Sequence, residues 1–185
     1  AGGPHRPPRR RHAGARPPVT APVAIFGIGN RSRGDDALGP LLLDHLRDWL
    51  RSRDLEGGFE LFEAYQLQVE NALDLEGREL ALFIDACREA PGAAQLRKLE
   101  PAVTPPSFHS HMLEPQAVLG VQRRITGRAP PPAFALGVRA ESFGLGEGLS
   151  AAAQEALGKA WPLLESLAGN PRLDSWEALA SPTRA

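Results

Sequence analysis

Carboxylates are the side chains of this sequence best suited to bind a metal ion or to transfer protons. Two adjacent acids, Asp35 and Asp36, follow a glycine-containing turn, and a third acid, Asp85, directly follows the apolar residues 82–84. An ionised carboxylate at the end of a buried strand is costly unless it is hydrogen-bonded, paired or bound to a cation. The residues alone leave two explanations open for each acid, a local hydrogen-bonding role and a ligand role.

Imidazoles could complete such a site. Outside the first 18 residues the sequence contains only His45, His109 and His111, and His45 falls within a helical pattern. The His-x-His pair does not have the i, i+4 spacing of a helical zinc pair, and no H-E-x-x-H motif is present. The sequence therefore suggests two carboxylates and one imidazole as a possible cluster, but the spacing alone does not show that they meet.

Several other chemistries fit the motifs poorly. In the run 27–36, Ser32 occupies the position where a dinucleotide-binding G-x-G-x-x-G fingerprint needs its third glycine, and no lysine follows as in a phosphate-binding loop. No G-x-S-x-G nucleophile elbow is present. The single cysteine, Cys87, excludes an intramolecular disulfide framework and is expected to be a small buried residue rather than a nucleophile.

Short apolar segments alternate with segments of helical periodicity, which predicts a three-layer α/β/α fold with a mostly parallel, twisted sheet of about five strands. The strands are expected at residues 23–29, 59–65 (near an edge), 80–86, 96–99 and 134–138. Helices are expected from about 38 to 50, 69 to 75, 112 to 125 and 151 to 167. We expect Asp35 or Asp36, Ser110 and Ser150 to cap three of these helices. Ligands of such sheets bind beyond the carboxyl ends of the strands.

The 185 residues suffice for one domain, which we place at 22–168. Residues 1–21 are rich in arginine and proline and are expected to be a disordered tail, and residues 169–185 a loose C-terminal tail. The formal net charge of −1 gives no reason to expect a nucleic-acid partner. No apolar run is long enough for membrane insertion, and no apolar segment follows the arginines as an export signal needs, so we expect a cytoplasmic protein.

Several motifs, taken together and in order, resemble the nickel–iron hydrogenase maturation proteases. They are the run from Gly27 to Gly39 with its acid pair, Phe-Ile-Asp-Ala at 83–86, Ser-His at 110–111, and residues 137–150. The resemblance covers about residues 22–167. Members of that family are endopeptidases that remove a C-terminal extension from the hydrogenase large-subunit precursor after nickel insertion. The resemblance implies the same activity and partner for this chain, and a twisted sheet of about five strands between helices.

The resemblance also implies a set of site residues. Asp36, the second of the two adjacent acids, and Asp85 would be the catalytic carboxylates and, with His111, the ligands of nickel. The nickel would be carried by the substrate, and no other cofactor is implied. The family segment after the second strand that helps to form the substrate groove matches Gln66, Gln68 and Glu70.

Two alternatives stay open. A non-catalytic, nickel-sensing chaperone of the large subunit would bind the same partner without cleaving it, and a nucleotide-binding α/β protein is a weaker candidate. It is also open whether the metal polarises the scissile carbonyl and activates water or only docks the substrate.

Overall fold

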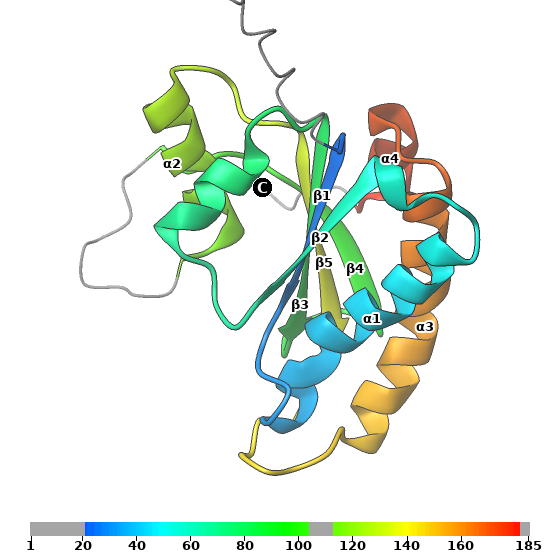
Figure 1. Cartoon of the computed structure of the whole chain (residues 1–185). Coiled ribbons are helices and arrows are strands. Elements are labelled where there is room, and N and C mark those ends of the chain that lie inside the picture. The colour runs from blue at the N-terminus through cyan, green and yellow to red at the C-terminus, as the bar shows by residue number, and fades with distance from the viewer. Residues whose placement is uncertain (1–20, 104–112, 182–185) are drawn as a thin grey trace, which may run out of the picture.

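The computed structural model describes residues 21–103 and 113–181, and its centre is one five-stranded sheet (Figure 1). The strand order is β2-β1-β3-β5-β4; the first four of these are parallel, and β4 is antiparallel to β5. The strands are β1 Val23–Ile28, β2 Phe59–Ala64, β3 Leu80–Cys87, β4 Ala94–Leu99 and β5 Ala133–Arg139. The mostly parallel sheet and the edge position of β2 confirm the prediction.

Helices cover both faces of this sheet, which confirms the three-layer α/β/α architecture (Figure 1). One face is covered by α1 Leu38–Arg51, α3 Ala151–Gly169 and α4 Leu173–Leu179. The other face is covered by the 3-10 helix η3 Val69–Leu75 and by α2 Pro115–Thr126. Two shorter 3-10 helices, η1 Gly34–Ala37 and η2 Glu56–Gly58, precede α1 and β2.

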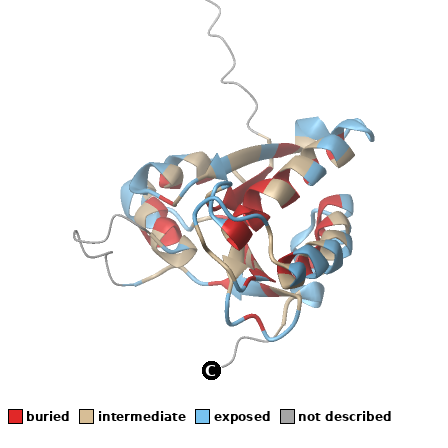
Figure 2. Ribbon diagram, turned by 90° about the horizontal axis from the view of Figure 1, so that it is seen from below, coloured by how far each residue is buried: buried red, intermediate tan, exposed pale blue. Residues whose placement is uncertain are grey.

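The alternation of side chains along the strands builds two separate cores. In β3, Leu82 and Ile84 join the core under α1 and α3, whereas Phe83 joins the core under η3 and α2. Buried residues accordingly lie along the strands and on the inward sides of the helices (Figure 2). Since side chains on a strand repeat every two residues, Asp85 faces the same side as Phe83, towards η3 and α2.

The prediction of a loose C-terminal tail from residue 169 is wrong. The segment forms α4, and its Trp176 is fully buried. The Trp176 indole Nε1 donates a hydrogen bond to the Leu167 carbonyl oxygen at 3.0 Å. The indole ring also packs edge to face on the Phe134 ring, with 5.4 Å between the ring centroids. A helix of seven residues in which only one large apolar side chain is buried is too short to be recognised from its periodicity in the sequence.

Two of the predicted helix caps are also corrected. The helix α1 continues directly from η1, its N-cap position is Ala37, and no side chain caps it, so neither Asp35 nor Asp36 has that role. The helix α2 begins at Pro115, which makes Ser110 too distant to be its cap. The third prediction is confirmed, because Ser150 caps α3 by accepting a hydrogen bond from the Ala153 amide at 3.1 Å.

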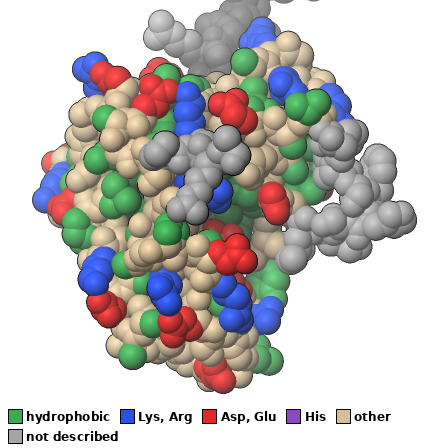
Figure 3. All heavy atoms as spheres, turned by 180° about the vertical axis from the view of Figure 1, so that it is seen from behind, with side chains coloured by type: hydrophobic (Ala, Val, Ile, Leu, Met, Phe, Trp, Pro, Cys, Tyr) green, Lys and Arg blue, Asp and Glu red, His purple; other side chains and the backbone are tan. Residues whose placement is uncertain are grey.

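The described surface carries charges of both signs. On the face shown in Figure 3, Lys and Arg side chains are interspersed with Asp and Glu side chains. Among the helices of the described ranges, none has the length and apolarity that crossing a bilayer requires.

Candidate active site

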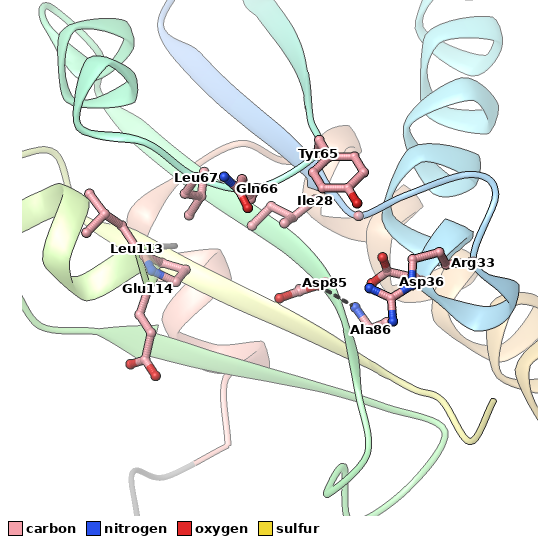
Figure 4. Close-up of a pocket in the computed structure, with 12 residues that line it drawn as sticks. Ile28, Arg33, Asp36, Tyr65, Gln66, Leu67, Asp85, Ala86, Leu113 and Glu114 are labelled. Carbon is pink, nitrogen blue, oxygen red and sulfur yellow. Dashed lines mark hydrogen bonds between the residues drawn. The ribbon is translucent and has the colours of Figure 1, made fainter. Parts of the chain in front are cut away.

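A cavity of about 570 Å³ opens at the carboxyl ends of β1 and β3, on the side of the sheet that faces η3 and α2 (Figure 4). Its walls are the end of β1, the η1 turn, residues 65–67, the end of β3 and residues 113–115. The chain leaves β1 towards β2 on one side, while β3 pairs with the other side of β1. The strand order therefore reverses between β1 and β3. Open α/β sheets bind ligands in the crevice that such a reversal leaves at the carboxyl ends of the strands.

Asp36 lines this cavity from the η1 turn. Its Oδ2 accepts a hydrogen bond from the Asn30 amide at 2.9 Å, which closes the turn after β1. The turn is tight enough to require glycine, because Gly29 has φ +134° and a Cβ there would lie 1.9 Å from the Asp36 carbonyl oxygen. The predicted carboxylate is therefore held at a fixed place beside the end of β1.

Asp85 lines the same cavity from the end of β3. Burial raises the pKa of Asp85 to about 7, and the negative charge of Asp36 contributes to this rise. The Ala86 amide has the opposite effect on the pKa, because it donates a hydrogen bond to Asp85 Oδ1 at 2.8 Å. A carboxyl group with a pKa close to neutral can exchange a proton during a reaction. A cation in the cavity would favour its ionised form.

The structure brings together only part of the predicted site. Gln66 lines the cavity together with Asp36 and Asp85, whereas Gln68 and Glu70 do not. Gln68 is instead the N-cap residue of η3, and its amide donates to the Asn71 side-chain oxygen at 2.9 Å.

The third predicted ligand, His111, and its neighbour His109 lie outside the described residues. Leu113, the first residue described after them, does line the cavity, and its amide donates to the Leu67 carbonyl oxygen at 3.2 Å. Within residues 21–103 and 113–181, no three His, Cys, Asp or Glu side chains are grouped so that they could hold a metal ion. The cavity thus contains two of the three predicted ligands, and the chain that carries the third rejoins the described structure at its wall.

Sequence reasoning missed the ion pairs that fix the turn after β1. The Arg31 guanidinium bonds both carboxylate oxygens of Glu63 at 2.7 Å and Asp44 Oδ2 at 2.7 Å, linking the turn to β2 and to α1. The hydrogen bonds from Arg31 lower the pKa of Glu63 and of Asp44. The partners are distant in the sequence, so no local pattern signals them.

The other acid of the pair, Asp35, has a different environment from Asp36. It is fully buried, and its carboxylate accepts hydrogen bonds from the amides of Glu141, Ser142 and Ser150 and from the Ser150 hydroxyl. Burial alone raises the pKa of Asp35, but these donors outweigh it and lower the pKa below its usual value. The two adjacent acids are therefore used differently, one inside the fold and one in the cavity.

Three further residues with charged or polar side chains line the cavity and were not predicted as site residues: Arg33, Tyr65 and Glu114. The Tyr65 side chain is exposed, and its hydroxyl accepts a hydrogen bond from the Asn30 side-chain amide at 3.2 Å. Arg33 is the N-cap residue of η1 and forms no ion pair within the described residues. The sequence places Arg33 in the turn after a predicted strand, Tyr65 at the end of the strand expected at 59–65, and Glu114 in the helix expected at 112–125. None of these positions signals a site.

Neither a protein-family model nor a curated protein matches this sequence. The fold, however, matches solved structures of [NiFe] hydrogenase maturation proteases. The protease HycI from Thermococcus kodakarensis KOD1 aligns with a TM-score of 0.59 and 23% identity over 81% of this chain and 94% of that one. The hydrogenase maturating endopeptidase HybD from E. coli aligns with a TM-score of 0.58 and 23% identity over 78% of this chain and 91% of that one. The hydrogenase 2 maturation peptidase from a Thaumarchaeota archaeon aligns with a TM-score of 0.55 and 24% identity over 80% of this chain and 97% of that one.

The chain therefore has the fold of the hydrogenase maturation proteases along nearly the full length of those proteins. The sequence-based expectation of this fold is confirmed.

Proposed function

We propose that this protein is an endopeptidase that removes the C-terminal extension of a nickel–iron hydrogenase large-subunit precursor once nickel has been inserted. The observation that carries the proposal is the meeting of Asp36 and Asp85 in one cavity at the carboxyl edge of the sheet. The shared fold with proteins named as endopeptidases adds support.

The nickel that the precursor carries is a substrate feature that the two carboxylates can recognise. One oxygen of each is engaged by a backbone amide, Oδ2 of Asp36 by Asn30 and Oδ1 of Asp85 by Ala86. The remaining oxygens, Oδ1 of Asp36 and Oδ2 of Asp85, accept no hydrogen bond within the described residues and can bind a cation. Oxygen donors joined by an imidazole from His111 suit a divalent first-row metal.

The cavity favours attack on the peptide bond by water. Its described lining contains no Ser, Thr or Cys side chain that could serve as a nucleophile. Asp85, with its pKa near 7, can accept a proton as water adds to the carbonyl carbon, and can return that proton to the leaving amine. Asp36 would hold the positively charged substrate group.

The experiment that tests the proposal is cleavage of a purified large-subunit precursor from the same organism, with and without inserted nickel. We expect a shift to lower mass only for the nickel-loaded precursor. A nickel-dependent complex without any change in mass would instead identify the chaperone. Asp48→Asn is a suitable control variant, because the Asp48 side chain is 79% exposed on α1 and does not line the cavity.

A further inference from the structure

The Asp35 carboxylate is buried without a cationic partner in the described part of the chain, and hydrogen bonds alone compensate its charge. Oδ2 accepts from the Glu141 amide at 2.7 Å, the Ser142 amide at 2.9 Å and the Ser150 hydroxyl at 2.8 Å, and Oδ1 accepts from the Ser150 amide at 2.7 Å. Ser150 is also the N-cap of α3, so the carboxylate lies at the positive end of a 19-residue helix dipole. This arrangement strongly fixes the position of Asp35.

The backbone around Asp35 is joined to the same segment at several points. The Asp35 amide donates to the Ser142 carbonyl oxygen at 2.8 Å, and the Gly34 amide donates to that of Glu147 at 3.2 Å. In the opposite direction, the Gly146 amide donates to the Ser32 carbonyl oxygen at 2.7 Å. The turn after β1 and residues 141–150 therefore form one hydrogen-bonded unit, with the Asp35 carboxylate at its centre.

Asp36 follows Asp35 within this unit but faces the cavity. Besides the η1 backbone, the contact that orients its carboxylate is the hydrogen bond from the Asn30 amide. We propose that Asp35 is a positioning residue: by locking the turn onto residues 141–150, its buried carboxylate sets where the Asp36 carboxylate stands relative to Asp85. This inference rests on the proposed function, because it assigns Asp35 to the same cleavage site.

The isosteric variant Asp35→Asn separates positioning from simple stabilisation. An amide keeps the shape of the side chain, but it has one acceptor oxygen where the carboxylate has two, and its NH₂ group faces hydrogen-bond donors. Trp176→Phe is the matched control, because it removes a buried hydrogen bond at α4, outside the unit around Asp35. Both variants are expected to melt at a lower temperature than the wild type.

Hydrogen exchange of backbone amides gives the deciding measurement without any substrate. In Asp35→Asn we expect exchange at least tenfold faster at the three amides that bond Asp35 and also at Asn30, whose amide bonds Asp36. In Trp176→Phe the Asn30 amide should exchange at the wild-type rate. Faster exchange at residues 141, 142 and 150 with an unchanged Asn30 amide would overturn the proposal.

Cleavage provides the second measurement, at a temperature where every variant is fully folded. Asp35→Asn should lower kcat for nickel-loaded precursor at least tenfold and leave KM within about twofold, since a displacement near 1 Å costs on the order of 100-fold. Equal kcat values for Asp35→Asn and Trp176→Phe would contradict the positioning role. Failure of the wild-type protein to cleave any precursor would count against the proposed function but would not affect the exchange result.

If Asp35→Asn does not fold, Ser150→Ala takes its place. That variant removes one of the four donors to the carboxylate and leaves the backbone amides in place. We expect exchange at Asn30 to accelerate severalfold. An unchanged Asn30 amide in a folded Ser150→Ala protein would equally overturn the proposal.

Discussion

Asp36 and Asp85 line a single cavity from the ends of two paired strands, and the negative charge of the first adds to the raised pKa of the second. The pairing of Gly27 with Ile84 brings the ends of β1 and β3 side by side. Gly39 allows α1 to pack against both strands, because a Cβ there would lie 2.3 Å from the Ile28 carbonyl oxygen and 2.8 Å from that of Ile84. The two acids are thus held together by the packing of the backbone beneath them.

Asp36→Asn should abolish cleavage of nickel-loaded precursor while the protein stays folded. An asparagine oxygen can still accept the Asn30 hydrogen bond, but the side chain no longer carries the charge that holds a cation. We expect a loss of at least about 100-fold in turnover, above the usual effect of groups that merely support a metal ligand. The measurement is the mass shift of the precursor together with the far-UV circular dichroism of the variant.

His111→Ala should abolish the same cleavage, and His109→Ala, as its matched control, should have a milder effect. Only His111 corresponds to the imidazole ligand in the motif resemblance. Time courses of precursor cleavage for the two variants provide the comparison. Full processing by both Asp36→Asn and His111→Ala would end the metal-recognition proposal.

Asp85→Asn should change how stability depends on pH. Because burial raises the pKa of Asp85 from 3.8 to about 7, the folded state binds its proton more tightly than the unfolded state does. This proton stabilises the folded wild-type protein fully below the pKa that Asp85 has in the unfolded state, and the stabilisation is lost as the pH rises through 7. The unfolding free energy of Asp85→Asn, relative to that of the wild type, should therefore increase by up to a few kcal/mol between pH 5 and pH 8, since one pKa unit corresponds to about 1.4 kcal/mol.

Urea unfolding of metal-free protein at several pH values measures this difference. Asp48→Asn, which makes the same substitution at an exposed position away from the cavity, serves as the control. A free-energy difference between Asp85→Asn and the wild type that does not vary from pH 5 to pH 8 would show that Asp85 has an ordinary pKa.

Trp176→Ala should show that α4 belongs to the folded domain. Removing a fully buried indole leaves a cavity beside Phe134 and an unpaired Leu167 carbonyl oxygen, so we expect a loss of about 3–5 kcal/mol in unfolding free energy. Leu179→Ala in the same helix is the control, because Leu179 is 45% exposed and should cost within about 0.5 kcal/mol. Denaturant unfolding of both variants decides the matter. Similar small losses in the two would mean that α4 adds little to the fold.

Cys87→Ser should keep the cleavage activity within about twofold of the wild type. Cys87 is the last residue of β3 and does not line the cavity, and the proposed mechanism uses water rather than a thiol. Initial rates of precursor cleavage test this directly. Abolished turnover in a variant that still folds and binds precursor would point to a cysteine-based mechanism.

The sequence alone was sufficient to predict most of the fold. Apolar runs such as residues 80–86 have the length and composition of buried strands, and the spacing of leucines in α1 is helical, so both elements are encoded locally. The residues alone identify Asp35, Asp36 and Asp85 as candidate carboxylates, and the motif resemblance favours Asp36 over Asp35. The sheet rule points to the carboxyl ends of the strands, and in the structure Asp36 and Asp85 line one cavity there.

Only the tertiary structure showed the different surroundings of Asp35 and Asp36. The two acids are chemically identical neighbours, and their difference comes from Glu141, Ser142 and Ser150, which the fold brings to Asp35 from a distant part of the chain. The docking of Trp176 against Phe134 likewise depends on segments far apart in sequence. Local periodicity indicates which side of an element is apolar. Which residues cover that side depends on the packing of the whole chain, so the sequence around a residue contains no pattern that identifies its partners.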